Sequence, residues 1–368
     1  MTSKIDKIFL ELVKAGIWGQ RTEVSVEAKE WAVLMQISER QSLLAVVFDG
    51  IQTLPRHLMP PMDILMDWLG QVEHIETQND SINKDVARLV RVMNHNCVAS
   101  RLMKGQGCAL YYPHPEHRQC GDIDLFVGNE YYQQAKESLA KMGVKIKRET
   151  AKDAQFTFGD SPVEMHRMED HFYSTRLDSV FQQICRMEEW VNPRVVKIGG
   201  EDVALFNVTF NVFYIFVHLY HHFLQVGVGL RQVCDWMMVM HKDESDVDWQ
   251  KLEGWLRGIK ALRAWKTFYG LTVEYLGQHL QNSPEWMNRW SKDDVEFILD
   301  DIMCQGNFGK YGESLRKREF RGGLFRNIGS FLALTKRLWR IQGFGRREVW
   351  AYPLWRMTKD KGMWKRYK

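Results

Sequence analysis

Apolar side chains recur every three or four positions through the N-terminal part of the chain. In residues 1–18 they alternate with lysines and acids, which predicts an amphipathic helix instead of a signal peptide. The spacing continues around Trp31 and Trp68, and prolines near residue 55 predict a break in the helices. We therefore predict a helical N-terminal domain at residues 1–103, whose last helix runs into Gly105.

A different pattern begins near residue 104. Short apolar runs, rich in aromatic or β-branched residues and bounded by Gly and Pro, predict strands, and one helical run lies among them. Strands are predicted at 108–112, 123–127, 144–147, 155–158 and 163–166, and a helix at 131–142. The last two strands should form a hairpin, because Gly159 and Pro162 lie between them. The segment 104–170 is therefore expected to hold a small mixed sheet.

Helical spacing returns after residue 170. Apart from a short hairpin predicted near 195–203, the segment 171–300 is expected to form a C-terminal helical domain. Residues 301–368 form a basic, aromatic-rich tail that is also expected to be helical. The predicted fold class is thus α+β, a small mixed sheet flanked by N-terminal and C-terminal helical domains.

The composition limits the class of protein. With 45% hydrophobic and 26% charged residues, the chain is expected to be globular and to bury a large core. Its most apolar run, 203–224, contains two asparagines and three histidines, so we predict no membrane span. The six cysteines are widely spaced, which is typical of reduced thiols and favours a cytoplasmic location.

The charge is uneven along the chain. The net charge is only +4, but the tail at 301–368 carries 17 Lys and Arg against 5 Asp and Glu. Basic and aromatic residues together suit single-stranded nucleic acid or an anionic membrane surface. They also suit a terminal helix that packs its aromatic face on the more acidic body. The sequence leaves these three interpretations of the tail open.

Two carboxylates alternate with apolar residues in one predicted strand. Asp122 and Asp124 fall on one face of it, and Ile123 and Leu125 on the other. Paired carboxylates are hard ligands suited to Mg²⁺ or Mn²⁺, although two solvated acids on an edge strand would show the same spacing.

A third carboxylate lies on another predicted strand. Glu164 and His166 face together in the strand at 163–166. If this strand lies beside that of Asp122 and Asp124, three carboxylates converge. Such a trio can hold two metal ions, one at the attacking hydroxyl and one at the departing phosphates.

These segments resemble a known family. The chain is similar to the uncharacterised nucleotidyltransferase family of the DNA polymerase β superfamily in Lys104-Gly105-Gln106-Gly107, Tyr111-Tyr112-Pro113, Arg118, Gly121-Asp122-Ile123-Asp124-Leu125 and Val163-Glu164-Met165-His166. The likeness continues in the helical segments at 218–223 and 229–235 and covers about residues 1–300.

The resemblance implies a function for the segment 104–170. It implies the nucleotidyltransferase fold and Mg²⁺-dependent transfer of a nucleoside monophosphate from an NTP to an unidentified hydroxyl acceptor. It also implies catalysis and metal ligation by Asp122, Asp124 and Glu164. The residues expected to bind the nucleotide are Lys104, Gly105, Gly107, Arg118 and His166. Arg231 and Asp235, four positions apart, are expected to form an ion pair at the nucleotide cleft, or simply to stabilise their helix.

One departure from the family pattern supports an alternative. Superfamily members usually carry Gly-Ser or Gly-Gly at the turn that holds the triphosphate, but here Gln106 follows Gly105. Backbone N–H groups could still bind phosphate. The alternative is a catalytically degenerate protein of the same fold that binds a nucleotide or a partner.

A second alternative rests on histidines. His218 and His222 share a helix face, a spacing compatible with zinc. However, Leu219 follows His218 where zinc proteases have glutamate. We therefore expect these histidines to bind acids or to line the cleft, and a zinc hydrolase is the weaker alternative.

Overall fold

The computed structural model describes residues 3–225, 227–307 and 336–351. Its α-helices are α1 (Lys4–Trp18), α2 (Glu30–Gln41), α3 (Leu44–Gln52), α4 (Met62–His95), α5 (Gln106–Ala109), α6 (Gly128–Lys141), α7 (Thr175–Glu188), α8 (Val208–Gln225), α9 (Leu230–Lys242), α10 (Trp249–Gly258), α11 (Leu262–Leu276) and α12 (Lys292–Gln305). Short 3₁₀ helices are η1 (Arg56–Leu58), η2 (Pro115–His117), η3 (Glu244–Asp246) and η4 (Glu285–Met287). A further helix occupies residues 336–351.

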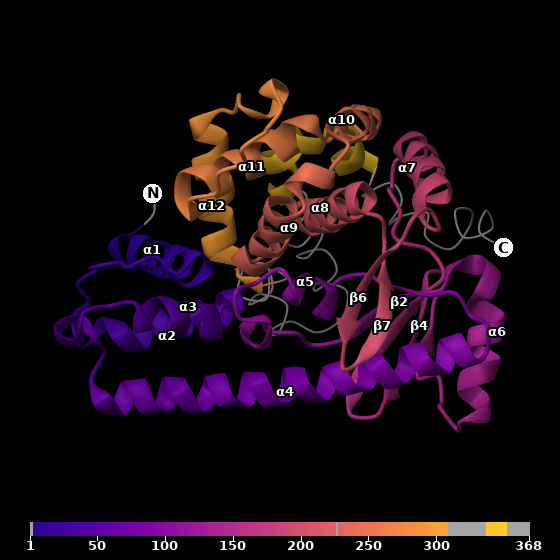
Figure 1. The fold of residues 1–368 in the computed structure, drawn as a ribbon. Helices are drawn as coiled ribbons and strands as arrows, with labels where there is room; N and C mark the ends of the chain where they lie inside the picture. The colour runs from indigo at the N-terminus through magenta and orange to yellow at the C-terminus, as the bar shows by residue number, and fades with distance from the viewer. Residues whose placement is uncertain (1–2, 226, 308–335, 352–368) are drawn as a thin grey trace, which may run out of the picture.

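The strands form one mixed sheet and one hairpin. The sheet has the order β1 (Arg101–Leu102), β2 (Ile123–Phe126), β5 (Ser161–His166), β4 (Asp153–Phe158) and β3 (Arg148–Glu149). Strand β2 runs parallel to β5, and the other pairs are antiparallel. The hairpin consists of β6 (Arg194–Ile198) and β7 (Glu201–Leu205). This mixture of a small sheet with flanking helices confirms the α+β class, as Figure 1 shows.

Helix α4 links the N-terminal helices to the sheet. It is 34 residues long and extends along the base of the molecule from α2 to the sheet (Figure 1). Its second half buries Val86, Leu89 and Val90 in a core shared with β2, β4, β5 and the hairpin. The apolar faces of the sheet residues, Ile123 and Leu125 among them, pack in the same core. This packing holds the polar face of β2 in a fixed direction.

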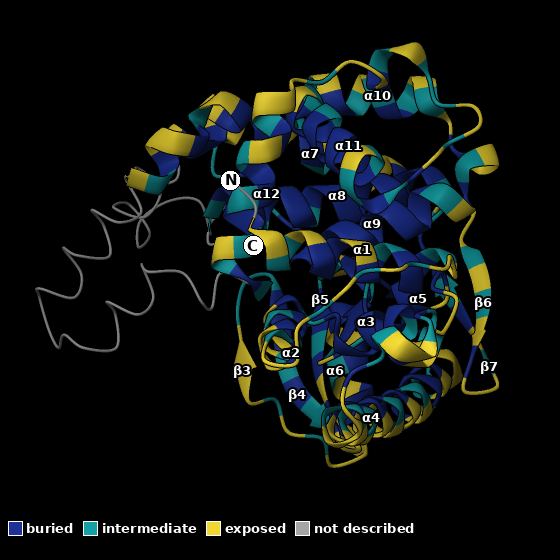
Figure 2. Cartoon of the chain, turned by 90° about the vertical axis from the view of Figure 1, so that its left-hand side faces the viewer, coloured by how far each residue is buried: buried dark blue, intermediate teal, exposed yellow. Residues whose placement is uncertain are grey.

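A larger core joins the helices of both ends of the chain. It includes residues of α1 and α3 together with α8, α9, α11 and α12. Helices α8 and α9 are buried along most of their length (Figure 2), which accounts for the long apolar run in the sequence. No helix in the described ranges is both long and apolar enough to cross a membrane.

The described part of the tail packs on the body. In the helix at 336–351, Leu338, Ile341 and Phe344 are buried in the larger core. Arg337 donates two hydrogen bonds to Asp301, at 2.6 and 2.9 Å. These residues agree with the interpretation of a terminal helix that packs on the body, although Trp339 and Trp350 are exposed. The remainder of the basic tail, at 308–335 and 352–368, lies outside the described ranges.

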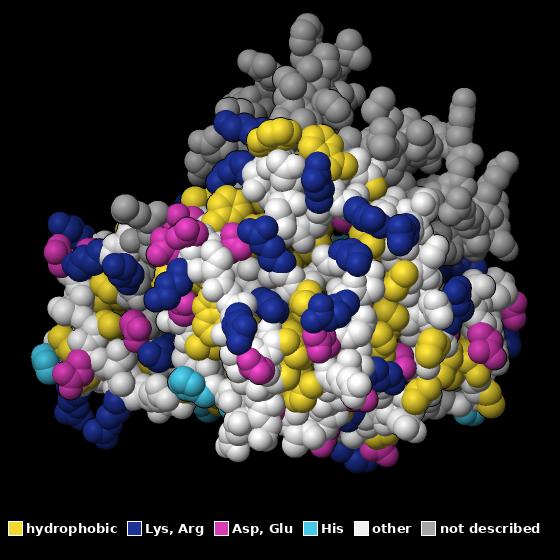
Figure 3. Space-filling model, turned by 90° about the horizontal axis from the view of Figure 1, so that it is seen from above, with side chains coloured by type: hydrophobic (Ala, Val, Ile, Leu, Met, Phe, Trp, Pro, Cys, Tyr) yellow, Lys and Arg dark blue, Asp and Glu magenta, His cyan; other side chains and the backbone are white. Residues whose placement is uncertain are grey.

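The surface above these helices is not uniformly basic. Figure 3 looks down on the molecule and shows Lys and Arg side chains distributed among acidic and apolar ones. Within the described residues, therefore, this face does not form a single cationic patch.

Three predictions about elements are wrong. The run 108–112 comprises the end of the short helix α5 and the turn after it, because Gly105 opens a helix and the tyrosine hydroxyls bond distant residues of the chain. The helix predicted to reach Gly105 ends at His95, where Cys97 has a positive φ of 54° and β1 follows. The strand predicted at 144–147 occurs instead as β3, directly after it.

Candidate active site

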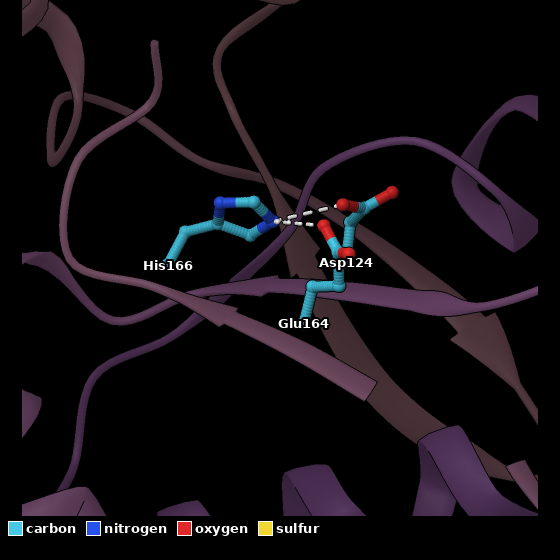
Figure 4. A group of neighbouring side chains, drawn as sticks. All are labelled: Asp124, Glu164 and His166. Carbon is cyan, nitrogen blue, oxygen red and sulfur yellow. Dashed lines mark hydrogen bonds and ion pairs between the residues drawn. The ribbon is translucent and has the colours of Figure 1, made fainter. Parts of the chain in front are cut away.

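The polar faces of β2 and β5 meet in the sheet. The two strands are parallel neighbours, and the register pairs Asp124 with Glu164 and Phe126 with His166. Asp122 directly precedes β2 on the same face as Asp124. The expectation that the two acidic strands lie side by side is confirmed, and Figure 4 shows Asp124, Glu164 and His166 converging.

These carboxylates line a cavity of about 240 Å³ between the sheet and the C-terminal helices. Six of the eight residues expected to catalyse the transfer or bind the nucleotide line it: Lys104, Gly105, Arg118, Asp122, Asp124 and Glu164. The remaining lining residues are Cys108, Gly121, Ile215, His218, Leu219, His222, Arg231, Gln232 and Asp235. The cavity thus brings together the acids of the sheet, Arg118 from the segment before β2, Arg231 of α9, and one face of α8.

Asp124 has a partner on each carboxylate oxygen. His166 Nε2 lies 2.8 Å from Oδ1, and Lys104 Nζ lies 3.1 Å from Oδ2. Burial alone would raise the pKa of Asp124, but Lys104 and the His166 hydrogen bond hold this pKa well below its usual range. Asp124 is therefore a fixed, ionised carboxylate although it is only 5% exposed.

The other two acids show the opposite tendency. Burial and the charge of Asp124 raise the pKa of Asp122, and the same two causes raise the pKa of Glu164. Like charges gathered in one site disfavour ionisation of their neighbours. For Lys104, burial lowers the pKa, but the charges of Asp124 and Asp122 outweigh burial and raise it. The cluster therefore favours a cation at its centre.

Two predicted binding residues do not line the cavity. His166 is 1% exposed and hydrogen-bonds Asp124. A Cβ atom at Gly107 would lie 3.1 Å from Leu205 Cδ2, so this glycine faces the β6–β7 hairpin. His166 is thus placed to orient a carboxylate, and Gly107 to allow close packing.

Gly105 shapes the edge of the cavity. Its φ of 53° and ψ of −119° lie outside the regions that side-chain-bearing residues occupy easily. A Cβ atom there would lie 3.1 Å from Cys120 Sγ and 3.3 Å from the Asp122 carbonyl oxygen. The turn at Gly105 therefore keeps the chain close to the start of β2 and places Lys104 beside Asp124.

Arg118 is held by Asp235 on α9. Its Nε and Nη2 donate to Asp235 Oδ1 and Oδ2 at 2.9 and 2.7 Å, and the Tyr112 hydroxyl donates to Oδ1 at 2.9 Å. Burial alone would lower the pKa of Arg118, but Asp235 raises it well above its ordinary value. The predicted Arg231–Asp235 ion pair is wrong, because Asp235 pairs with Arg118 while Arg231 donates to the carbonyl of Gln119.

The histidines of α8 form part of the cavity wall. The rings of His218 and His222 lie 4.4 Å apart. Burial lowers the pKa of His218 and, with the charge of Lys104, lowers that of His222 to about 4, so both rings are neutral near pH 7. Across the described residues, the group able to hold a metal consists of Asp124, Glu164 and His166 and contains neither histidine of the zinc alternative.

The periodicity of the sequence did not indicate several of the lining residues. Ile215, Leu219 and Gln232 sit in helices that are buried nearly all round, where periodicity cannot tell a cavity wall from the core. The resemblance, in contrast, indicated that Asp235 and Arg231 face the cleft. Chemical type alone would not have found either residue.

Comparisons with known proteins identify the family of the chain. The model of the family described as "Uncharacterised nucleotidyltransferase" matches residues 27–277. Among solved structures, ANT(2")-Ia in complex with adenylyl-2"-tobramycin is similar at 12% identity over 50% of this chain and 97% of that chain, with a TM-score of 0.33. No curated protein matches the chain. Because the family model covers well over half of its residues, the chain belongs to the uncharacterised nucleotidyltransferase family.

Proposed function

We propose that the protein is a metal-dependent nucleotidyltransferase that moves a nucleoside monophosphate from an NTP to a hydroxyl acceptor. The observation that carries this proposal is the parallel pairing of β2 with β5, which sets Asp124 opposite Glu164. Asp122 lines the same cavity. Carboxylates so arranged match the chemistry expected of the family.

The donor set suits Mg²⁺ or Mn²⁺. Asp124, Glu164 and His166 each offer a ligand atom within 4.8 Å of the others, and Asp122 adds a further carboxylate to the cavity. Carboxylate oxygens are the ligands these hard cations prefer, and a cation would offset the repulsion among the acids. When bound, the metal supplies charge neutralisation of the phosphates and activation of the attacking hydroxyl.

The protein's own residues have separate tasks in the transfer. The acceptor oxygen attacks the α-phosphorus, the bond from that phosphorus to the bridging oxygen breaks, and pyrophosphate leaves with the electron pair. Glu164, whose carboxylate is partly exposed, accepts the proton of the hydroxyl. His166 fixes the direction of Asp124, and Lys104 offsets negative charge beside it.

A cytoplasmic location is part of the proposal. All six cysteines are free, as is usual where thiols are kept reduced.

One observation favours the degenerate alternative. Gln106 occupies the position where the superfamily usually has Ser or Gly, and its amide donates to Asn79 Oδ1 at 3.0 Å instead of lining the cavity. The protein would then bind a nucleotide without transferring it.

An assay of label transfer separates these functions. The full chain is incubated with each α-labelled NTP, Mg²⁺ or Mn²⁺, and a panel of hydroxyl acceptors. We expect transfer by the wild type, none by Asp122→Ala/Asp124→Ala, and normal transfer by Asp80→Asn, which changes an exposed acid of α4. Thermal unfolding of each variant checks that it is folded.

Two results would count against the proposal. Transfer that survives the double substitution would remove these acids from the mechanism. Nucleotide binding by the wild type with no transfer to any acceptor would favour the degenerate alternative.

A further inference from the structure

The first turn of α9 presents two hydrogen-bond donors that have no partner. Arg231 Nε and Gln232 Nε2 are both buried, and neither makes a hydrogen bond within the described chain. Both residues line the cavity that holds the carboxylates. Buried donors are almost always satisfied in folded proteins, so an unsatisfied pair in a cavity points to a ligand that accepts hydrogen bonds.

The charges of the cavity identify the kind of ligand. Lys104 pairs with Asp124, and Arg118 pairs with both oxygens of Asp235. Arg231 instead donates to the neutral carbonyl of Gln119. No carboxylate of the described residues forms an ion pair with it, although burial lowers the pKa of its guanidinium. A partly buried cation that pairs directly with no carboxylate is costly to desolvate, and an anion would offset that cost.

The orientation of Gln232 strengthens this argument. Its Oε1 accepts a hydrogen bond from the Gly229 N–H at 2.8 Å, so the amide nitrogen is the free end. Gln232 is only 6% exposed, and its donor is therefore not satisfied by bulk water. Both side chains also sit at the positive end of a helix of 13 residues, where anions are favoured.

We propose that Arg231 and Gln232 bind the β- and γ-phosphates of the NTP. This inference rests on the proposed function and adds the group that holds the leaving pyrophosphate. It also changes the role of Arg118, which the family resemblance implied would bind the nucleotide. Because Asp235 already neutralises Arg118, this arginine is a positioning residue that ties the segment before β2 to α9.

Binding of inorganic tripolyphosphate tests the proposal without catalysis. Isothermal titration calorimetry of the full chain in a buffer with EDTA measures the dissociation constant. Arg231→Gln removes the charge, and Gln232→Glu keeps the oxygen that caps Gly229 while removing the free donor. Arg257→Gln, which changes an exposed arginine of α10, is the matched control.

We expect both variants to bind tripolyphosphate about tenfold more weakly or worse, since charge-assisted hydrogen bonds are lost. The control should bind as the wild type does. Should one variant fail to fold, the other still decides the matter.

The outcomes distinguish this inference from the proposed function. If the wild type transfers label and both variants bind tripolyphosphate normally, the assignment to α9 is wrong while the function stands. If the wild type neither binds tripolyphosphate nor transfers label from any NTP, the inference and the proposed function both fail.

Discussion

At the scale of single residues, Gly105 and Gly121 border the cavity but face different constraints. Gly105 has a positive φ and would place a Cβ against Cys120 and Asp122, whereas a Cβ at Gly121 would meet nothing within 4 Å. We expect Gly105→Ala to lower the free energy of unfolding by about 1–3 kcal/mol and to reduce transfer. Urea unfolding measures the first effect and the label assay the second.

Gly121→Ala is the matched control for this substitution. It should change the free energy of unfolding by about 0.5 kcal/mol or less, since its new methyl group meets open space. Equal stability of the two variants would contradict our account of the turn at Gly105.

Single residues also show what the sequence could reveal. The shared direction of Asp122 and Asp124 follows from the two-residue period of a strand, so it was predictable. The sequence could not predict, in contrast, which of Arg118 and Arg231 is available to bind a phosphate. The answer depends on which of the two guanidinium groups forms an ion pair with Asp235. Asp235 lies more than a hundred positions from Arg118 in the sequence.

At the scale of elements, the Arg118–Asp235 pair fastens α9 to the segment before β2. Arg118 is 5% exposed, so Asp235→Ala would leave a buried cation unpaired. We expect this variant to lose about 3–5 kcal/mol of the free energy of unfolding, as is usual when one partner of a buried pair is removed. Chemical denaturation measures the loss.

The exposed pair of Arg289 with Glu285 supplies a comparison. Glu285→Ala should cost about 0.5 kcal/mol or less, because exposed ion pairs contribute little. A loss at Asp235 as small as that at Glu285 would show that the buried pair does not hold the cavity wall.

The elements nearest the cavity were the hardest to predict. The run 108–112 has the composition of a strand, but the Tyr111 hydroxyl bonds Asp243 and the Tyr112 hydroxyl bonds Asp235. These long-range contacts favour a turn over a strand. They cannot be inferred from the local spacing of apolar residues. Longer elements such as α1 and the β4–β5 hairpin followed their periodicity and were predicted correctly.

At the scale of the whole molecule, one histidine joins three separate elements. In η2, His117 Nδ1 lies 2.8 Å from Asp49 Oδ1 of α3, and His117 Nε2 lies 2.9 Å from Glu76 Oε1 of α4. Burial alone would lower the pKa of His117, but its hydrogen bonds to Asp49 and Glu76 and the charges of Asp49 and Glu116 raise it to about 9. This pKa exceeds the value of about 6.5 in the unfolded chain.

The stability that His117 contributes therefore depends on pH. It is fully present below pH ~6.5 and is lost as the pH rises through about 9. We expect the free energy of unfolding to fall by on the order of 2–3 kcal/mol across this window, and by less in His117→Gln. Urea unfolding at both ends of the window, with exposed His57→Gln as the control, isolates the contribution. Identical pH dependence in wild type and His117→Gln would contradict it.

One shared core joins α1, α3, α8 and α11, helices from both ends of the chain. It fixes the helices that form the cavity wall, while the pairing of β2 with β5 keeps their acids aligned.

The central claim is that these acids bind a divalent cation. Electron paramagnetic resonance of Mn²⁺, titrated into the protein with a nonhydrolysable NTP analogue, tests it most directly. We expect wild type and Asp80→Asn to bind Mn²⁺ equally and Asp124→Asn to bind it at least about tenfold more weakly. Equal binding by Asp124→Asn and the wild type would contradict the claim.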